Sequence, residues 1–421
     1  MSKKRVCSES TRRRNRVEPP TRPTDSTKST RLTTVFFIIF VISSAVSIFV
    51  YCHYNHSSIS SPYLSENNLV KSDVNYQEII DENSRVSDNV TQRHFDKSVL
   101  AYITPWNSAG YEIAKRFSSK FTHISPVWYD LKSQGIKLTL EGRYNADTGW
   151  LSELRLRGNT RVLPRVVLEA LPKDLFGKKK QRDKAIDLIV TECTDMDYDG
   201  VVLESWSRWA AYGVLNDAAT RKLALQFVKQ LGDALHKVIS QRSGQQLQLV
   251  FVIGPPHSEK LQAHDFGPKD LLDLSDSVDG FSLMTYDYSS SYSPGPNAPL
   301  LWVRSVIELL LSASSKSLAD KVLVGINFYG YDFDLTEGGG AQAITGRDYL
   351  SLLDRYKPKI EWREDFAEHF FLYTNDQHRQ HAVFYPTPLS ILKRLDEARS
   401  WGAGISIWEI GQGLDFFFDL L

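Results

Sequence analysis

Residues 198–206 read YDGVVLESW, a short β-rich run that begins with Asp-Gly and ends on Glu204, Ser205 and Trp206. Side chains alternate in direction along a β-strand, so Val202, Glu204 and Trp206 are predicted to share one face. If this strand belongs to a closed barrel and that face points inward, Glu204 and Trp206 are expected to meet at the barrel mouth.

Eight β-rich runs of this kind alternate with longer amphipathic stretches from about residue 95 onward. Such alternation is typical of βαβ units and a parallel sheet. The runs are Val99–Thr104, Thr122–Trp128, Val162–Leu168, Val201–Glu204, Gln246–Ile253, Phe281–Thr285, Val322–Asn327 and Ile405–Trp408. They predict an α/β fold, a closed (β/α)8 TIM barrel over residues 96–421, with a doubly wound open sheet as the alternative.

Two of the connections between these runs carry additional signals. Between the fourth and fifth runs an apolar residue recurs at every fourth position, from Leu223 to Ile239, which predicts a long amphipathic crossover helix. The connection between the seventh and eighth runs is much longer than a barrel requires, with three glycines early and many aromatic residues later. We therefore expect a small insertion at about residues 331–385, between strand 7 and helix 7.

Composition limits the classes of function. With 421 residues and 42% hydrophobic side chains, the chain can bury a large core. Its 50 basic and 50 acidic side chains cancel, and nucleic-acid binders usually show a basic face, so no nucleic-acid partner is expected. No metal site and no cofactor are predicted.

The N-terminal region has the pattern of a membrane anchor. Residues 1–34 form a basic tail without apolar periodicity, and residues 35–52 form an uncharged apolar run that is near the lower limit for a membrane span. Positive charge before the run favours a cytoplasmic N-terminus, hence a single-pass type II signal-anchor protein with a lumenal or extracellular barrel. Residues 53–95 are expected to be a mostly disordered lumenal stem. A cleaved signal peptide is the alternative.

Sequons and cysteines fit a protein of the secretory pathway whose fold rests on its core. Asn55 and Asn89 each begin an Asn-x-Ser/Thr glycosylation sequon after the apolar run. Cys7, Cys52 and Cys193 are too dispersed for a disulfide framework within the barrel. Cys193 shares a helical face with apolar residues, which predicts a buried thiol.

The fourth run resembles the strand-4 motif of family 18 glycoside hydrolases, Asp-Gly-x-Asp-x-Asp-x-Glu, whose last residue is the catalytic acid. Asp199 and Gly200 match the start of the motif. Val202 and Glu204 stand at its two inward aspartates, and Trp206 stands at the position of the catalytic glutamate.

Other runs extend the resemblance over about residues 95–421. Met284, Tyr286 and Asp287 are similar to the family's sixth-strand Met-x-Tyr-Asp element, and Tyr329-Gly330 to its seventh-strand region. Trp408 resembles the tryptophan of the eighth strand, and Tyr102 and Trp106 resemble residues of the first. The resemblance implies that these side chains line a sugar site.

The family's mechanism needs a protonated carboxylic acid beside the glycosidic oxygen, and an indole cannot supply that proton at neutral pH. We therefore assign no catalytic residue and expect a chitinase-like lectin for chitin oligosaccharides or other N-acetylglucosamine-containing glycans. The residues expected to stack on sugar or hydrogen-bond to it are Trp206, Trp408, Tyr286, Trp106, Asp287 and Glu204.

Three alternatives stay open at this point. The first is a weak glycosidase that uses Glu204 with Asp287, and the second is a receptor-binding scaffold. The third is that Trp206 is simply buried. Residues 406–415 and 384–395 resemble a stabilin-interacting, chitinase-like branch of the family. That resemblance implies a stabilin-type scavenger receptor as partner, a role in carbohydrate sensing and innate immunity, and a lysosomal or secreted location if the anchor is cleaved.

Overall fold

A computed structural model describes residues 69–421, apart from residues 86–88, 136, 257 and 259. The expected tail, the expected anchor at residues 35–52 and the sequon at Asn55 lie outside the described residues. Among the residues described, no helix combines the length and the apolar character needed to cross a membrane.

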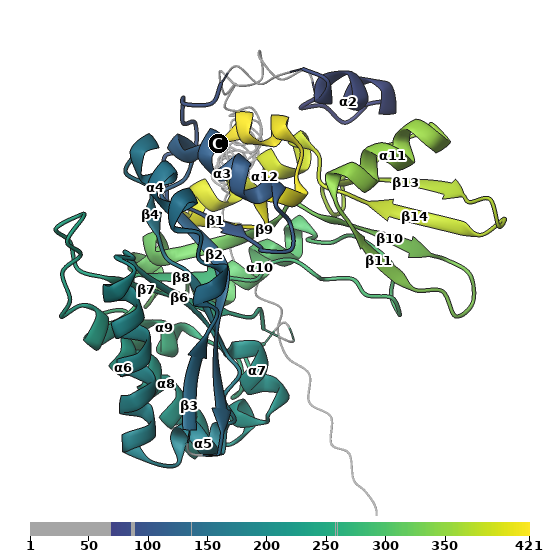
Figure 1. Cartoon of the computed structure of the whole chain (residues 1–421). Coiled ribbons are helices and arrows are strands. Elements are labelled where there is room, and N and C mark those ends of the chain that lie inside the picture. The colour runs from purple at the N-terminus through teal and green to yellow at the C-terminus, as the bar shows by residue number, and fades with distance from the viewer. Residues whose placement is uncertain (1–68, 86–88, 136, 257, 259) are drawn as a thin grey trace, which may run out of the picture. The chain divides into compact units, whose positions relative to one another are not determined.

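Eight parallel strands close into a barrel (Figure 1). In chain order they are β1 (Val99–Ile103), β2 (His123–Gln134), β5 (Arg165–Leu168), β6 (Gly200–Glu204), β7 (Gln248–Ile253), β8 (Gly280–Leu283), β9 (Val322–Asn327) and β15 (Gly404–Trp408). Strand β1 pairs in parallel with both β15 and β2, which closes the ring. The predicted closed barrel is confirmed, and the open sheet is excluded because such a sheet would leave two unpaired edges.

Helices surround the barrel and connect its strands (Figure 1). They are α3 (Ala109–Arg116), α4 (Thr148–Arg157), α5 (Pro172–Phe176), α6 (Lys179–Asp195), α7 (Trp206–Ala211), α8 (Ala218–Leu235), α9 (Pro268–Leu274), α10 (Leu300–Leu310) and α12 (Pro388–Trp401). Two short strands, β3 (Lys137–Glu141) and β4 (Arg161–Val162), pair with β2.

Helix α8 is the predicted crossover. Its N-terminus is capped by Asp217, whose side chain accepts from the backbone N–H of Thr220 at 2.8 Å. Phe227 and Leu231 are fully buried along its apolar stripe. The helix ends at Leu235. Ile239, which we expected on the same stripe, lies beyond the helix and is 55% exposed.

The barrel lumen and the layer between strands and helices form separate hydrophobic clusters, because alternate side chains of each strand point to opposite faces. On β1, Leu100 and Tyr102 face the lumen, whereas Val99, Ala101 and Ile103 belong to the outer layer. The buried lumen residues are Leu100, Tyr102, Leu163, Val202, Val250, Val252 and Leu323. Cys193 is in the outer layer and 1% exposed, as predicted, and burial raises the pKa of its thiol.

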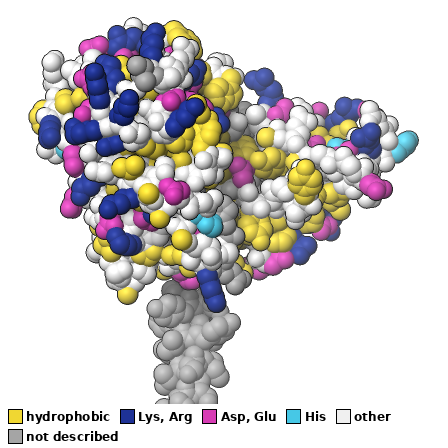
Figure 2. Space-filling view, turned by 90° about the horizontal axis from the view of Figure 1, so that it is seen from below, with side chains coloured by type: hydrophobic (Ala, Val, Ile, Leu, Met, Phe, Trp, Pro, Cys, Tyr) yellow, Lys and Arg dark blue, Asp and Glu magenta, His cyan; other side chains and the backbone are white. Residues whose placement is uncertain are grey.

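The insertion between β9 and α12 is a five-stranded antiparallel sheet with one helix. Its elements are β10 (Gly330–Asp334), β11 (Ala341–Ile344), α11 (Gly346–Tyr356), β12 (Glu361–Arg363), β13 (Glu368–Thr374) and β14 (Gln380–Phe384). It projects to the right of the barrel in Figures 1 and 2. Figure 2 also shows Lys and Arg side chains interspersed with Asp and Glu on the displayed face, in keeping with a formal net charge of zero.

The folded unit includes residues that we expected in a disordered stem. Helix α2 (Tyr76–Asn83) begins with a capping box at Asn75 and lies beside α11. Leu69, Val74 and Ile79 are each at most 3% exposed, so this segment buries enough apolar surface to be ordered against the rest of the fold.

Candidate functional site

The C-terminal ends of the barrel strands bring polar and aromatic side chains into the upper lumen. In barrels of this kind ligands bind at this end, because the loops that follow the strands gather there. Tyr102 of β1, Glu204 of β6 and Trp408 of β15 have the same strand parity as buried lumen residues. Met284 follows β8 and packs against the same lumen cluster.

Tyr102 and Trp408 form the aromatic floor of this site. Their ring centroids are 5.2 Å apart. The Tyr102 hydroxyl donates to Ser282 Oγ at 2.9 Å, and the Ser282 hydroxyl donates to Ser406 Oγ at 3.0 Å. Burial raises the pKa of Tyr102 to about 12, so its hydroxyl stays protonated at neutral pH. Trp408 is only partly buried, so part of its ring remains accessible.

Arg165 is one of the residues of this site that the sequence analysis missed. It is 9% exposed, forms an ion pair with Glu204, and holds its guanidinium carbon 4.9 Å from the centroid of the Trp408 ring. A carboxylate paired with a guanidinium is a poor proton donor, because protonation would break the pair. A signal existed in the sequence, since Arg165 is a lone cation inside an apolar run with the same parity as Leu163.

Trp206 lies elsewhere than expected. Strand β6 ends at Glu204, and Trp206 is the first residue of α7. The alternation of side chains along the strand therefore does not extend to Trp206 and does not place it beside Glu204. The side chain is 4% exposed and belongs to the outer layer, with its ring centroid 5.5 Å from Phe266 and 6.3 Å from Phe251. Its ring faces are covered by protein.

The edge of the Trp206 ring that carries Nε1 lies beside Gly254, the residue that follows β7. A Cβ atom added to Gly254 would lie 3.6 Å from Trp206 Nε1 and 3.9 Å from the terminal methyl of Met284. Any contact of Trp206 with a ligand would therefore use the indole edge and not a ring face.

The segment after β8 and the insertion build the rim together. The Asp287 carboxylate accepts hydrogen bonds from Tyr329 and, at 2.9 Å, from the hydroxyl of Tyr331 on β10. The Asp287 backbone N–H donates to Asn297 Oδ1 at 2.7 Å, which holds a left-handed backbone with φ 61°. Burial, reinforced by the negative charge of Asp287, raises the pKa of Tyr329 and the pKa of Tyr331. Both hydroxyls therefore stay protonated at neutral pH and remain donors. Asp287 itself is exposed.

Tyr286 links this rim to the floor. Its ring lies 6.2 Å from that of Tyr329, and burial raises the pKa of its hydroxyl, a rise that the nearby positive charge of Arg165 opposes. The structure thus brings Tyr102, Glu204, Met284, Tyr286, Asp287 and Trp408 around one mouth.

Trp106 and Glu409 stand beside this mouth. Trp106 follows β1 and is 70% exposed, free to present a ring face. Glu409 is fully buried and accepts from Asn107 Nδ2 at 2.7 Å and from the Gly411 N–H at 2.9 Å. Burial raises the pKa of Glu409 to about 7. Glu409 thereby ties the loop that carries Trp106 to the residues that follow Trp408.

Asp199 and Gly200, the start of the strand-4 motif, lie at the opposite end of β6. Asp199 accepts from the Val162 N–H at 2.8 Å and pairs with Arg242, so its carboxylate has a structural role at the strand start. Gly200 has φ 141°, and a side chain there would collide with the backbone of Gln248. Within the described residues, no cluster of His, Cys, Asp and Glu side chains could hold a metal ion.

The sequence profile of glycosyl hydrolases family 18 matches residues 172–413, more than half of the chain, and the chain belongs to this family. Among curated proteins it is similar to the cortical fragment-lytic enzyme of Bacillus subtilis, with 30% identity over 193 residues that make up 44% of this chain and 42% of the relative. The chain spans less than half the length of the curated relatives it matches.

Solved structures share the fold. A chitinase from Chromobacterium violaceum superposes with a TM-score of 0.63 at 19% identity, covering 77% of this chain and 98% of the chitinase. A chitinase of Cycas revoluta in complex with (GlcNAc)4 superposes with a TM-score of 0.62 at 14% identity, covering 76% of this chain and 97% of that one.

Proposed function

We propose that this protein binds oligosaccharides that contain N-acetylglucosamine at the barrel mouth and cleaves them slowly or not at all. The partly accessible ring of Trp408, which packs on buried Tyr102, and the exposed ring of Trp106 offer aromatic surface for pyranose rings. Asp287 and its two tyrosine partners offer hydrogen bonds to sugar hydroxyls. The complex of the Cycas revoluta chitinase with (GlcNAc)4 supports this ligand class.

The proposal of slow or absent cleavage rests on the side chains at the C-terminal end of β6. Glu204 is the acidic side chain that this strand end directs into the mouth, and Arg165 pairs with it. The motif position of the catalytic acid is occupied by Trp206, which is packed in the outer layer. A general acid must reach the leaving oxygen in its protonated form. An indole has no acidic proton at neutral pH, and Glu204 would have to give up its pair with Arg165 to carry one, which supports slow or absent cleavage.

A weak glycosidase is the second candidate, and the names of the relatives favour it, because several are called lytic enzymes or glycosylases. In that case Glu204 would have to leave Arg165 and act together with Asp287. A ligand that displaces the guanidinium would be needed to free the carboxyl group.

Calorimetric titration of the purified full-length protein with chitotetraose tests the binding. We expect saturable binding that Trp408→Ala abolishes, because the accessible floor ring is lost. Leu372→Ala, an exposed apolar side chain of the insertion, is the matched control and should bind normally. Absence of binding by the folded wild-type protein would refute the lectin proposal and leave the receptor-binding scaffold.

The location of the protein and its protein partner are part of the same proposal. We propose a type II anchor at residues 35–52, a barrel in the secretory pathway, and a stabilin-type receptor as partner. Asn89, the sequon within the described residues, is half-buried, and its Nδ2 lies 3.0 Å from His94 Nε2. Enzymatic deglycosylation of the expressed protein tests this topology, since a cytoplasmic barrel would show no mass shift.

A further inference from the structure

A polar cavity lies at the opposite end of the barrel from the proposed saccharide mouth. It has a volume of about 510 Å³ and is lined by residues that precede barrel strands, among them Ser98 before β1, Thr122 before β2 and Asn159 before β4. The lumen between the two ends is filled by buried side chains such as Leu100, Leu163 and Leu323. A ligand in this cavity would therefore bind independently of one at the mouth.

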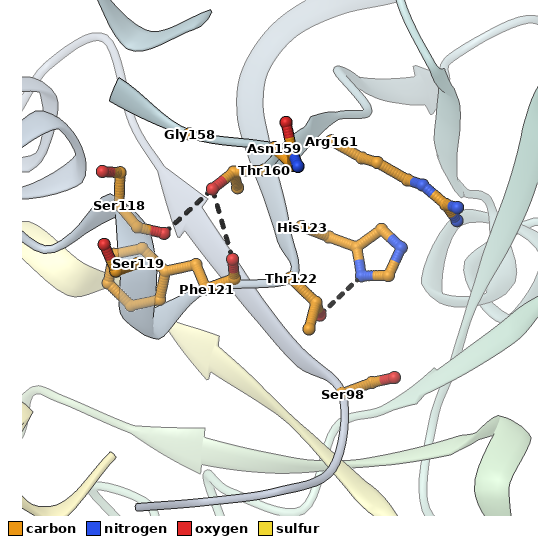
Figure 3. Close-up of a pocket in the computed structure, with 10 residues that line it drawn as sticks. All are labelled: Ser98, Ser118, Ser119, Phe121, Thr122, His123, Gly158, Asn159, Thr160 and Arg161. Atoms are coloured by element: carbon orange, nitrogen blue, oxygen red, sulfur yellow. Dashed lines mark hydrogen bonds between the residues drawn. The ribbon is translucent and has the colours of Figure 1, made fainter. Parts of the chain in front are cut away.

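Part of the wall is held by internal hydrogen bonds. The Thr160 hydroxyl donates to the Ser118 carbonyl at 2.9 Å, and the Thr122 hydroxyl lies 2.8 Å from His123 Nδ1 (Figure 3). Burial lowers the pKa of His123 to about 4, and the charge of Arg161 contributes to this lowering. The imidazole is therefore neutral at pH 7, and Arg161 supplies the positive charge of the cavity.

Other polar groups are left available. Within the described part of the chain, the hydroxyls of Ser98 and Ser119 and the amide of Asn159 have no hydrogen-bond partner, and Arg161 has no acidic partner. One Arg161 nitrogen donates to Gln245 Oε1, which leaves further guanidinium N–H groups free. Figure 3 shows Ser118 and Ser119 on one side of the cavity and His123 with Arg161 on the other.

A neighbouring cavity extends this polar surface. It has a volume of about 320 Å³ and shares Asn159 and Arg161 with the first. It adds Arg242, whose charge is compensated by Asp199. Among the described residues that line the two cavities, none is acidic.

We propose that this end of the barrel binds a small molecule that carries a phosphate or sulfate group together with further hydroxyls. The guanidinium fork of Arg161 can pair with such an oxyanion, and the hydroxyl and amide groups that line the same cavity can hydrogen-bond to the rest of the ligand. The cavity is larger than a lone phosphate needs and lies in the size range of small-molecule sites. A sugar phosphate has this combination of charge, hydroxyls and size.

Calorimetry on the full-length protein with glucose 6-phosphate, inorganic phosphate and glucose tests the proposal. Glucose 6-phosphate should bind most tightly, inorganic phosphate more weakly, and glucose should not bind here. Arg161→Gln should weaken binding of glucose 6-phosphate by about tenfold or more, since a charge-assisted hydrogen bond is lost. Saturating chitotetraose should leave the affinity unchanged.

Arg363→Gln is the matched control, because Arg363 is a half-exposed arginine of the insertion that pairs with Asp365. If Arg161→Gln fails to fold, the double variant Ser119→Ala/Asn159→Ala removes two of the free partners and should also weaken binding. The proposal is overturned if glucose 6-phosphate does not bind, if glucose binds equally well, or if Arg161→Gln binds like the wild type.

Discussion

The ends of β6 and β8 open onto the same barrel mouth but differ in construction. At the β6 end, Trp206 turns into the outer hydrophobic layer and Glu204 is neutralised by Arg165. At the β8 end, Tyr286 stays partly accessible and Asp287 is exposed, with two tyrosine hydroxyls donating to it. The first end is organised for packing and charge compensation, and the second for polar contact with a ligand. Binding and proton transfer can therefore be separated within one mouth.

The largest effect should come from removing the packed ring. Trp206→Ala should lower the free energy of unfolding by about 3 to 5 kcal/mol, as expected for a buried tryptophan that leaves a cavity. Trp106→Ala, at an exposed position, should change it by less than about 0.5 kcal/mol. Urea unfolding followed by circular dichroism measures both. Equal stabilities would show that Trp206 is not a core residue.

The second largest effect should come from breaking the ion pair between Arg165 and Glu204. Arg165→Met should lower the free energy of unfolding by about 3 kcal/mol, because the Glu204 carboxylate, whose side chain is only 16% exposed, is left without its partner. Adding Glu204→Gln should restore much of this loss, since the charge is then removed as well. The same unfolding measurement applies. Additive losses in the double variant would contradict a direct coupling between the two side chains.

The β8 end of the mouth is tested by a substitution at Asp287 that preserves the backbone conformation. Asp287→Asn should weaken chitotetraose binding by about tenfold, or about 1.4 kcal/mol, because a charged acceptor is lost. Asparagine tolerates the left-handed backbone at this position, so stability should change little. Calorimetric titration gives the affinity, with Asp365→Asn in the insertion as control. An unchanged Kd would remove Asp287 from the binding site.

The smallest effect, taken per pH unit, concerns the pH dependence of stability. The folded pKa of Glu409 is about 7, above the ordinary value near 4.5, so the folded state binds more protons than the unfolded state between these values. Its contribution to stability is therefore complete below the unfolded pKa and is lost as pH rises towards 7. Wild type minus Glu409→Gln should show a slope of about 1 kcal/mol per pH unit between pH 5 and 7. Parallel pH profiles would contradict this.

Much of the fold could be predicted because strand periodicity is local. All eight β-rich runs became barrel strands, since each combines β-branched residues with an amphipathic neighbour that covers it. The helix stripe through Leu223 was read one turn too far, because periodicity continues to Ile239 while the helix ends at Leu235. The packing of residues 69–85 was missed because its few apolar residues are separated by polar ones.

The site was only partly predictable because it depends on where a strand ends. Glu204 and Trp206 have the same parity in sequence, yet one residue more or less of strand decides whether Trp206 enters the lumen or the outer layer. To predict Arg165 as a site residue, one would have to know that the third strand directs the side chain at position 165 into the lumen. Glu409 and Tyr331 could not be predicted from local sequence, because their roles depend on tertiary contacts between segments that are distant in the chain.

Prolonged incubation of the full-length protein with chitotetraose, followed by mass spectrometry of the products, tests the central claim most directly. The claim predicts that the tetrasaccharide is bound and recovered intact or nearly so by the wild type, and that Glu204→Gln leaves this recovery unchanged. Release of shorter oligosaccharides by the wild type, abolished in Glu204→Gln, would contradict it and assign Glu204 a catalytic role.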